Sequence, residues 1–187
     1  MLVRNAVRAT LVGTLTALAL FSGQAVAAPE EVPRNAAAPK ILTYDADQSA
    51  EFAGAVEDGV DVWNESVTSV RLEPAEDGEQ ANIRIVADDG WPRALVTSLG
   101  NGIIYMGREA VQQGHHTVRI AAHELGHILG LPDVKPGPCS SLMSGSSAGT
   151  SCTNPRPDAS EKAEVEENFT EGLTGAVDRQ RTLVFQD

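Results

Sequence analysis

Apolar side chains recur at helical spacing in the first half of the chain, which predicts an amphipathic helix there. Asp45 and Gln48 have the spacing of a capping box, in which an N-cap residue pairs with a side chain three positions later. We therefore expect the helix to begin at these residues and to end near Ser66. Its apolar face is formed by residues that follow one another at steps of three or four: Phe52, Val56, Val60 and Trp63.

Two further helices are predicted by the same spacing and by signals at their ends. One covers Thr117 to Leu129, and Gly130 stands where a left-handed C-cap belongs. The other covers Asp158 to Phe169, with Glu161 as its capping-box partner. The segment between them, Leu131 to Pro157, is rich in Pro, Gly and Ser and is expected to be irregular.

Short apolar runs between turn-rich segments predict strands, because strands are typically bounded by Gly, Pro, Asn and Asp. Five such runs lie before the second predicted helix: Lys40–Tyr44, Ser69–Glu73, Asn82–Ala87, Ala94–Leu99 and Ile103–Met106. The chain therefore mixes strands and helices.

Residues 1–27 have the profile of a signal peptide. The only charges before Glu30 are those of Arg4 and Arg8, and an uncharged apolar stretch follows them. The triplet Ala25–Ala27 has the small-x-small form that signal peptidase cleaves, so we expect a secreted, extracellular protein. The alternative is an uncleaved membrane anchor, which the Gly, Ser and Gln residues within the run disfavour. No later segment is apolar enough to span a bilayer.

Three segments are expected after the leader. Residues 28–39 are rich in Pro and Ala without apolar periodicity, which is typical of a short pro-segment or lead-in. Residues 40–169 carry all the predicted elements, and their length suits one domain with a sizeable core. Residues 170–187 give no firm structural signal and are interpreted as a C-terminal tail.

Charge and cysteine content narrow the class of protein. The formal net charge is −12, and it becomes more negative once the two leader arginines are removed, so nucleic acid is not an expected partner.

Cys139 and Cys152 are the two cysteines, and in an oxidising compartment they are expected to form one disulfide worth roughly 3 kcal/mol in the chain-entropy model. Two metal-bound thiolates are the alternative, but the loop lacks the further sulfur or imidazole that they would need.

All four histidines lie between positions 115 and 127. His123 and His127 are four residues apart, and such residues differ by about 40 degrees around a helix axis, so both imidazoles can meet one ion. Glu124, one step round the helix, can reach water bound to that ion without binding the ion itself. Catalytic zinc takes three protein ligands and keeps a fourth position for water, so the site needs one more ligand.

Asp133 meets that requirement. Gly130 can adopt positive φ and turn the chain back, and Pro132 ends any helical continuation, which brings Asp133 beneath the two histidines. His116 would lie about 10 Å along the axis from His123, so it and His115 are expected to be solvated residues near the helix start. Satisfied surface histidines are the alternative for the whole group.

The run His123–Asp133, read as HELGHILGLPD, followed ten residues later by Met143 in Ser-Leu-Met-Ser, resembles the metzincin clan of zinc peptidases. The Asp ligand, the short chain and the cysteine-bracketed Met segment are similar to the snapalysin family of small secreted neutral proteases. The resemblance covers about Lys40 to Phe169. It implies an α+β fold, a single metzincin-like domain with a twisted mixed sheet of four or five strands, an N-terminal helix, an active-site helix and a C-terminal helix.

The resemblance also implies roles for individual residues. Met143 is expected to lie in a methionine turn and to form an apolar floor under the metal, with plain core filling as the alternative. Where relatives are expected to carry a tyrosine two residues after the ligand Asp, this chain has Lys135, which would either stabilise an oxyanion or be solvated. The family is similar to calcium-stabilised enzymes, but His116 and Val118 stand where an Asp and a Thr would be wanted, which argues against Ca²⁺.

The expected function is therefore that of a zinc endopeptidase acting on internal peptide bonds of extracellular proteins. One Zn²⁺ activates water and Glu124 acts as general base. An extended substrate is expected to pair with an edge strand at Asn101–Gly107. We expect a monomer that has no membrane partner after leader cleavage.

Two other functional classes remain open. A secreted zinc-binding interaction protein without catalysis is suggested by Lys135, but Glu124 argues against it because this residue has no duty in holding the ion. A metal-free adhesion domain would leave the ligand spacing as a coincidence.

Overall fold

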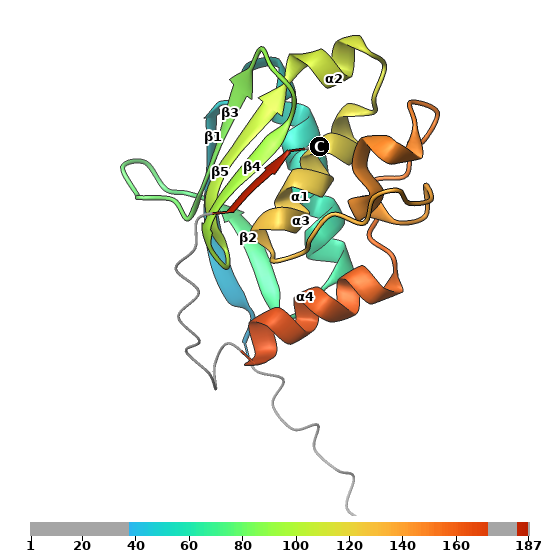
Figure 1. The fold of residues 1–187 in the computed structure, drawn as a ribbon. Helices are drawn as coiled ribbons and strands as arrows, with labels where there is room; N and C mark the ends of the chain where they lie inside the picture. Colours follow the sequence, from blue (N-terminus) through green and yellow to red (C-terminus); the bar gives the residue numbers. More distant parts are fainter. Residues whose placement is uncertain (1–37, 172–182, 187) are drawn as a thin grey trace, which may run out of the picture. The chain divides into compact units, whose positions relative to one another are not determined.

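A mixed sheet of six strands, with helices packed on it, is the frame of the part that the structure, a computed structural model, describes: residues 38–171 and 183–186 (Figure 1). The expected signal peptide and almost all of the expected lead-in lie outside these residues. The strands are β1 (Lys40–Gln48), β2 (Val70–Pro74), β3 (Ile83–Asp88), β4 (Arg93–Ser98), β5 (Asn101–Gly107) and β6 (Leu183–Gln186).

One helical segment follows β1, and the other helices follow β5. Within the described segments they are η1 (Ala50–Phe52), α1 (Ala53–Ser66), α2 (Arg108–Gln112), α3 (Thr117–Ile128), η2 (Leu142–Ala148) and α4 (Ala159–Glu171), where η marks 3₁₀ turns. None of them is long and apolar enough to cross a bilayer. The expected class, α+β with a mixed sheet and three main helices, is confirmed, and β6 makes the sheet one strand larger than expected.

The sheet has the strand order β2-β1-β3-β5-β4-β6. The first four strands in this order run parallel to their neighbours, whereas β4 runs antiparallel to β5 and β6 runs antiparallel to β4. A tight turn at Leu99–Gly100 joins β4 to β5, and Gly100 has the positive φ of 79° that such a turn favours. The result is a hairpin that puts β4 outside β5.

The sequence-based prediction that Asn101–Gly107 is the exposed edge strand is therefore wrong. This strand, β5, pairs with β3 on one side and with β4 on the other. The hairpin turn is the physical reason, because it lays β4 over the free side of β5. The outer side of β4 in turn pairs with β6.

The predicted start of the first helix is also wrong. Asp45 and Gln48 lie in β1, where they pair with Arg84 and Val86 of β3, and the helical turns begin only at η1. The local capping signal is outweighed by this pairing, which extends β1 beyond the predicted strand. The Asp45 carboxylate accepts a hydrogen bond from the amide of Asp47 at 2.9 Å instead of capping a helix.

The core lies between one face of the sheet and helices α1 and α3, which pack closely against each other (Figure 1). A Cβ placed on Gly59 of α1 would meet the Cβ of Ala121 at 3.0 Å, so the absence of a side chain allows this approach. Trp63, almost completely buried, donates a hydrogen bond from Nε1 to the Ala122 carbonyl at 2.8 Å. These contacts fix α3 directly beside His123.

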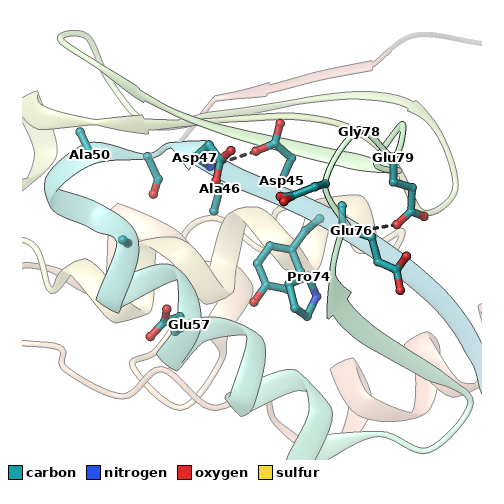
Figure 2. Close-up of a pocket in the computed structure, with 14 residues that line it drawn as sticks. Asp45, Ala46, Asp47, Ala50, Glu57, Pro74, Glu76, Gly78 and Glu79 are labelled. Atoms are coloured by element: carbon teal, nitrogen blue, oxygen red, sulfur yellow. Dashed lines mark hydrogen bonds between the residues drawn. The ribbon is translucent and has the colours of Figure 1, made fainter.

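A surface hollow lies between the end of β1 and the residues that follow β2 (Figure 2). It shares no residue with the predicted metal ligands. Much of its lining is acidic, so it gathers part of the chain's negative charge in one place: Asp45, Asp47, Glu57, Glu76, Asp77 and Glu79.

Candidate metal centre

Helix α3 and the loop after it bring three side chains to one point. The Oδ1 atom of Asp133 lies 3.4 Å from Nε2 of His123 and 3.5 Å from Nε2 of His127. The two Nε2 atoms are 3.0 Å apart. Ligand atoms about 2.0 to 2.2 Å from a tetrahedral zinc ion would be separated by about 3.3 to 3.6 Å. The three side chains thus form a group of the size that one zinc ion requires.

Backbone carbonyls orient both imidazoles. Nδ1 of His123 lies 3.0 Å from the Leu142 carbonyl oxygen, and Nδ1 of His127 lies 2.8 Å from that of Leu131. A carbonyl can only accept, so each Nδ1 carries the proton and each Nε2 keeps its lone pair. Two nitrogen lone pairs and one carboxylate oxygen therefore converge, a donor set that fits a divalent cation.

Burial and charge favour the protonation states that metal binding needs. Burial lowers the pKa of His127 below its usual range, so the imidazole is neutral at neutral pH. Burial alone would raise the pKa of Asp133, but the two histidines and Lys135 outweigh it and hold this pKa well below its usual range. Neutral histidines and an ionised aspartate are the forms that bind a metal ion.

Gly130 turns the chain back toward the histidines, as its sequence position predicts. It has a φ of 98°, its amide donates to the His127 carbonyl, and the Leu131 amide donates to the Gly126 carbonyl, both at 3.0 Å. This hydrogen-bond pattern is a Schellman motif. It lets the chain return along the helix end, which brings Asp133 beside His127.

Glu124 projects from α3 next to His123 and is fully buried. The pKa of Arg93, the first residue of β4, is raised mainly by the Asp88 carboxylate. The negative charge of Glu124 raises this pKa further. The predicted base therefore lies near the first residue of β4.

Met143 lies under α3, within η2. It is fully buried, and a Cβ placed on Gly126 would come within 2.7 Å of its Sδ atom. Since Gly126 lies between the two histidines in sequence, the Met143 side chain packs against the backbone of the segment that carries them. The Met143 carbonyl also accepts a hydrogen bond from the Val134 amide at 2.8 Å, which joins this segment to the residue after Asp133.

Two buried charged side chains that sequence reasoning did not assign to the site hold the segment around Met143. Arg119, on α3, donates to the carbonyls of Ser141 and Leu142 and to Oγ of Ser144. The sequence shows only an Arg in the first turn of this helix, and no side-chain motif indicates its role because its partners are mainly backbone carbonyls.

Glu161 holds the same segment from the other side. Its carboxylate accepts from the Leu142 and Met143 amides at 3.1 and 2.9 Å and from Oγ of Ser141 at 2.6 Å. It also accepts from the Asp158 amide at 2.7 Å, while Asp158 accepts from the Glu161 amide at 2.9 Å. The predicted capping box is therefore present, and the same carboxylate supports the methionine segment.

Lys135 is solvent-exposed, but its ammonium group reaches back to Asp133. Its Nζ atom is 3.3 Å from Oδ1 of Asp133, and 27% of its side chain is exposed. The ammonium group therefore adds a positive charge beside the carboxylate that faces the histidines.

The other two histidines lie apart from the three candidate ligands, at the start of α3. His116 is the N-cap, and its Nδ1 accepts a hydrogen bond from the Arg119 amide at 3.3 Å, while His115 packs edge-on against Trp91. Both are half-buried rather than fully solvated. They help to line a small hollow beside His123, together with Arg119, Ile120, Gly145 and Ser146.

The disulfide between Cys139 and Cys152 is formed, as expected, and it closes the loop that contains η2. The two ends of the methionine segment are thus joined covalently.

Comparison with known proteins places this geometry in a family. A model described as the Streptomyces extracellular neutral proteinase (M7) family matches residues 40–172. The chain is 36% identical over 147 residues to the extracellular small neutral protease of Streptomyces sp. (strain C5), covering 79% of this chain and 63% of that protein. It is 37% identical over 133 residues to the protein of the same name from Streptomyces caespitosus, covering 70% of this chain and 98% of that one.

Coverage differs among the relatives. The chain spans 63% of the length of the relatives from strain C5 and from Streptomyces lividans. Among solved structures, archaemetzincin from Methanopyrus kandleri aligns over 74% of this chain and 99% of its own with a TM-score of 0.46 and 12% identity. The resemblance carried by His123–Asp133 is confirmed by the family match: the chain belongs to the Streptomyces extracellular neutral proteinase (M7) family.

Proposed function

We propose that the chain is a secreted zinc-dependent endopeptidase that hydrolyses internal peptide bonds of extracellular proteins. The observation that carries this proposal is the convergence of His123, His127 and Asp133, with buried Glu124 beside them. The names of the relatives, extracellular small neutral proteases, agree with it. We further propose that the protein acts as a monomer, without a nucleic-acid or membrane partner.

The site residues divide the chemistry between them. When bound, zinc would supply a Lewis acid for the scissile carbonyl and would acidify a water molecule. His123, His127 and Asp133 would hold the ion, with their orientation fixed by backbone carbonyls and by the ammonium group of Lys135. Glu124 would accept a proton from the attacking water and pass it to the leaving amine.

The buried position of Glu124 suits a general base. Glu124 is fully buried in α3, one residue after His123, so its carboxylate has a fixed position beside the candidate ligands. Met143 and Trp63 pack closely against α3 at Gly126, two residues after Glu124, and restrict its movement. A carboxylate held in a fixed position is what precise proton transfer requires.

Lys135 is proposed to assist the reaction by charge. Its contact with Asp133 holds the ammonium group at the site, which supports a role in stabilising an oxyanion over a purely solvated side chain. We expect Lys135→Met to lower kcat about hundredfold with little change in KM, because the interaction would act only in the transition state. Zinc content should be retained. Loss of zinc from this variant, or an unchanged kcat, would count against the role.

Casein hydrolysis tests the proposed function. Wild-type protein should cleave casein, and both a zinc chelator and Glu124→Gln should lower kcat/KM by at least about hundredfold. Glu109→Gln, at an exposed position of α2, is the matched control and should behave as wild type. Activity that survives both the chelator and Glu124→Gln would remove the enzyme assignment. Zinc bound without any hydrolysis would favour a zinc-binding interaction protein.

A further inference from the structure

The strand β6 occupies the edge of the sheet nearest the candidate metal centre. It pairs antiparallel with the outer side of β4, so that Arg93, Ala94, Leu95 and Val96 face Gln186, Phe185, Val184 and Leu183 in turn. In Figure 1 this strand, drawn in red, runs alongside β4 toward α3. Without β6, the backbone groups on that side of β4 would be open to another extended chain.

Phe185 connects this strand to the metal centre. Its ring stacks on the imidazole of His127, with ring centroids 4.3 Å apart and an angle of 10° between the planes. The His127 side chain is fully buried in this arrangement. An aromatic side chain from β6 thus covers one face of a proposed metal ligand.

The outer edge of β4 lies beside His127, because Phe185 of its partner strand stacks on that imidazole. Arg93, the first residue of β4, pairs with Gln186 of β6. The charges of Asp88 and of Glu124 raise the pKa of Arg93. An extended peptide that takes the place of β6 on this edge would run past His127. Strand addition of this kind is a common way to bind a peptide backbone.

We propose that β6 is an internal substrate-like strand that holds the peptide-binding edge of β4 closed. This inference rests on the proposed peptidase function. A substrate would have to displace residues 183–186 from β4 and the Phe185 ring from His127 before its own backbone could pair there. The tail is therefore a competitive inhibitor built into the chain.

The attachment of this strand is suited to reversible release. β6 has four residues, and the side chains of Leu183 and Val184 are 45% and 62% exposed. Phe185 is partly buried and packs against the core, so of these three side chains it makes the main contact with the rest of the molecule. Removing that ring should shift the strand from the docked to the released state without disturbing the ligands.

Kinetics of full-length variants test the proposal. Phe185→Ala should lower KM for casein about tenfold and leave kcat nearly unchanged, because apparent affinity rises with the fraction of open molecules. Val184→Ala is the matched control, since this outward-facing side chain should affect neither constant. Phe185→Leu, which keeps an apolar contact without ring stacking, should give an intermediate KM.

Amide hydrogen exchange provides a readout that does not depend on activity. In metal-free and in zinc-loaded protein alike, Phe185→Ala should speed exchange of the Arg93–Val96 amides, whereas Val184→Ala should not. A synthetic peptide with the sequence of residues 182–187 should inhibit Phe185→Ala competitively and slow exchange of β4 again.

The outcomes separate this inference from the proposed function. Casein hydrolysis with the same KM in wild type and Phe185→Ala, or unchanged β4 exchange in Phe185→Ala, would overturn the inhibitory strand and leave the peptidase standing. Absence of hydrolysis in every variant, with faster β4 exchange in Phe185→Ala, would overturn the peptidase and with it the inhibitory role, although β6 would still be shown to dock.

Discussion

Gly130 adopts a backbone conformation that a side chain would oppose. Its φ is 98°, and a Cβ at this position would lie 2.6 Å from Nδ2 of Asn168, which itself donates to the Leu129 carbonyl. We expect Gly130→Ala to lower the free energy of unfolding by about 1–3 kcal/mol, as measured by urea denaturation. The cause is strain at the turn that positions Asp133, so the variant should also bind zinc more weakly.

Gly54 provides the control for that prediction. It lies in helix α1, and a Cβ there would meet nothing within 4 Å. Gly54→Ala should therefore be neutral or raise stability by about 0.5 kcal/mol through helix propensity. Equal destabilisation by the two substitutions would contradict the account of Gly130.

Helix-end features could be predicted from the sequence where their hydrogen bonds join residues that are close in the chain. The left-handed glycine after α3 and the reciprocal capping of Asp158 and Glu161 follow from the sequence. The cap expected at Asp45 failed because pairing with β3, far away in sequence, outweighed it. The support that Glu161 gives to Met143 was not predictable, since the two residues are 18 positions apart and meet only in the folded chain.

At the scale of elements, α4 holds the methionine segment through one buried carboxylate. Glu161 accepts hydrogen bonds from two backbone amides of η2. Glu161→Ala would leave these buried donors unsatisfied, so we expect a loss of about 2–4 kcal/mol in unfolding free energy. Glu164→Ala, at an exposed position of the same helix, should change stability by less than about 0.5 kcal/mol. Thermal unfolding followed by circular dichroism would compare the two variants.

A second connection between elements depends on pH. Glu51 of η1 binds Arg108 of α2, with Oε1 2.5 Å from Nε, and this hydrogen bond lowers the pKa of Glu51 from 4.5 to about 2. Because the folded pKa is below the ordinary value, the stabilisation is present above about pH 4.5 and is lost as pH falls toward 2.

Urea midpoints of wild type and Glu51→Gln should therefore differ at about pH 6 and converge near pH 2. The two proteins would be compared at several pH values in the same salt concentration. A difference that is constant across this range would show that the ionised carboxylate is not the stabilising form.

The sequence predicted where the strands lie along the chain better than it predicted their order in the sheet. All five predicted runs are strands, but the edge was assigned to Asn101–Gly107 because sequence does not reveal which side of a hairpin faces outward. β6 was missed because Leu183–Gln186 is short and has no turn signal or alternation of its own. Its conformation depends on pairing with β4.

At the scale of the whole molecule, the disulfide closes the segment that supports the candidate metal centre. Cys139 and Cys152 are 13 residues apart, so their bond should contribute roughly 3 kcal/mol by the chain-entropy model. Replacing both cysteines by Ala should lower Tm by roughly 10 °C, measured by calorimetry. Ser151→Ala, at an exposed position in the same loop, should leave Tm unchanged. An equal Tm for wild type and the double variant would contradict this contribution.

The account as a whole depends on one metal ion held by three side chains, which elemental analysis of dialysed, folded protein measures directly. We predict one zinc per chain in wild type and in Glu124→Gln, and little or none in His127→Ala and Asp133→Ala. The pair of results matters, because Glu124 is assigned to proton transfer and the other two residues to metal binding. Folded wild type without stoichiometric zinc, or Asp133→Ala that retains it fully, would contradict the account.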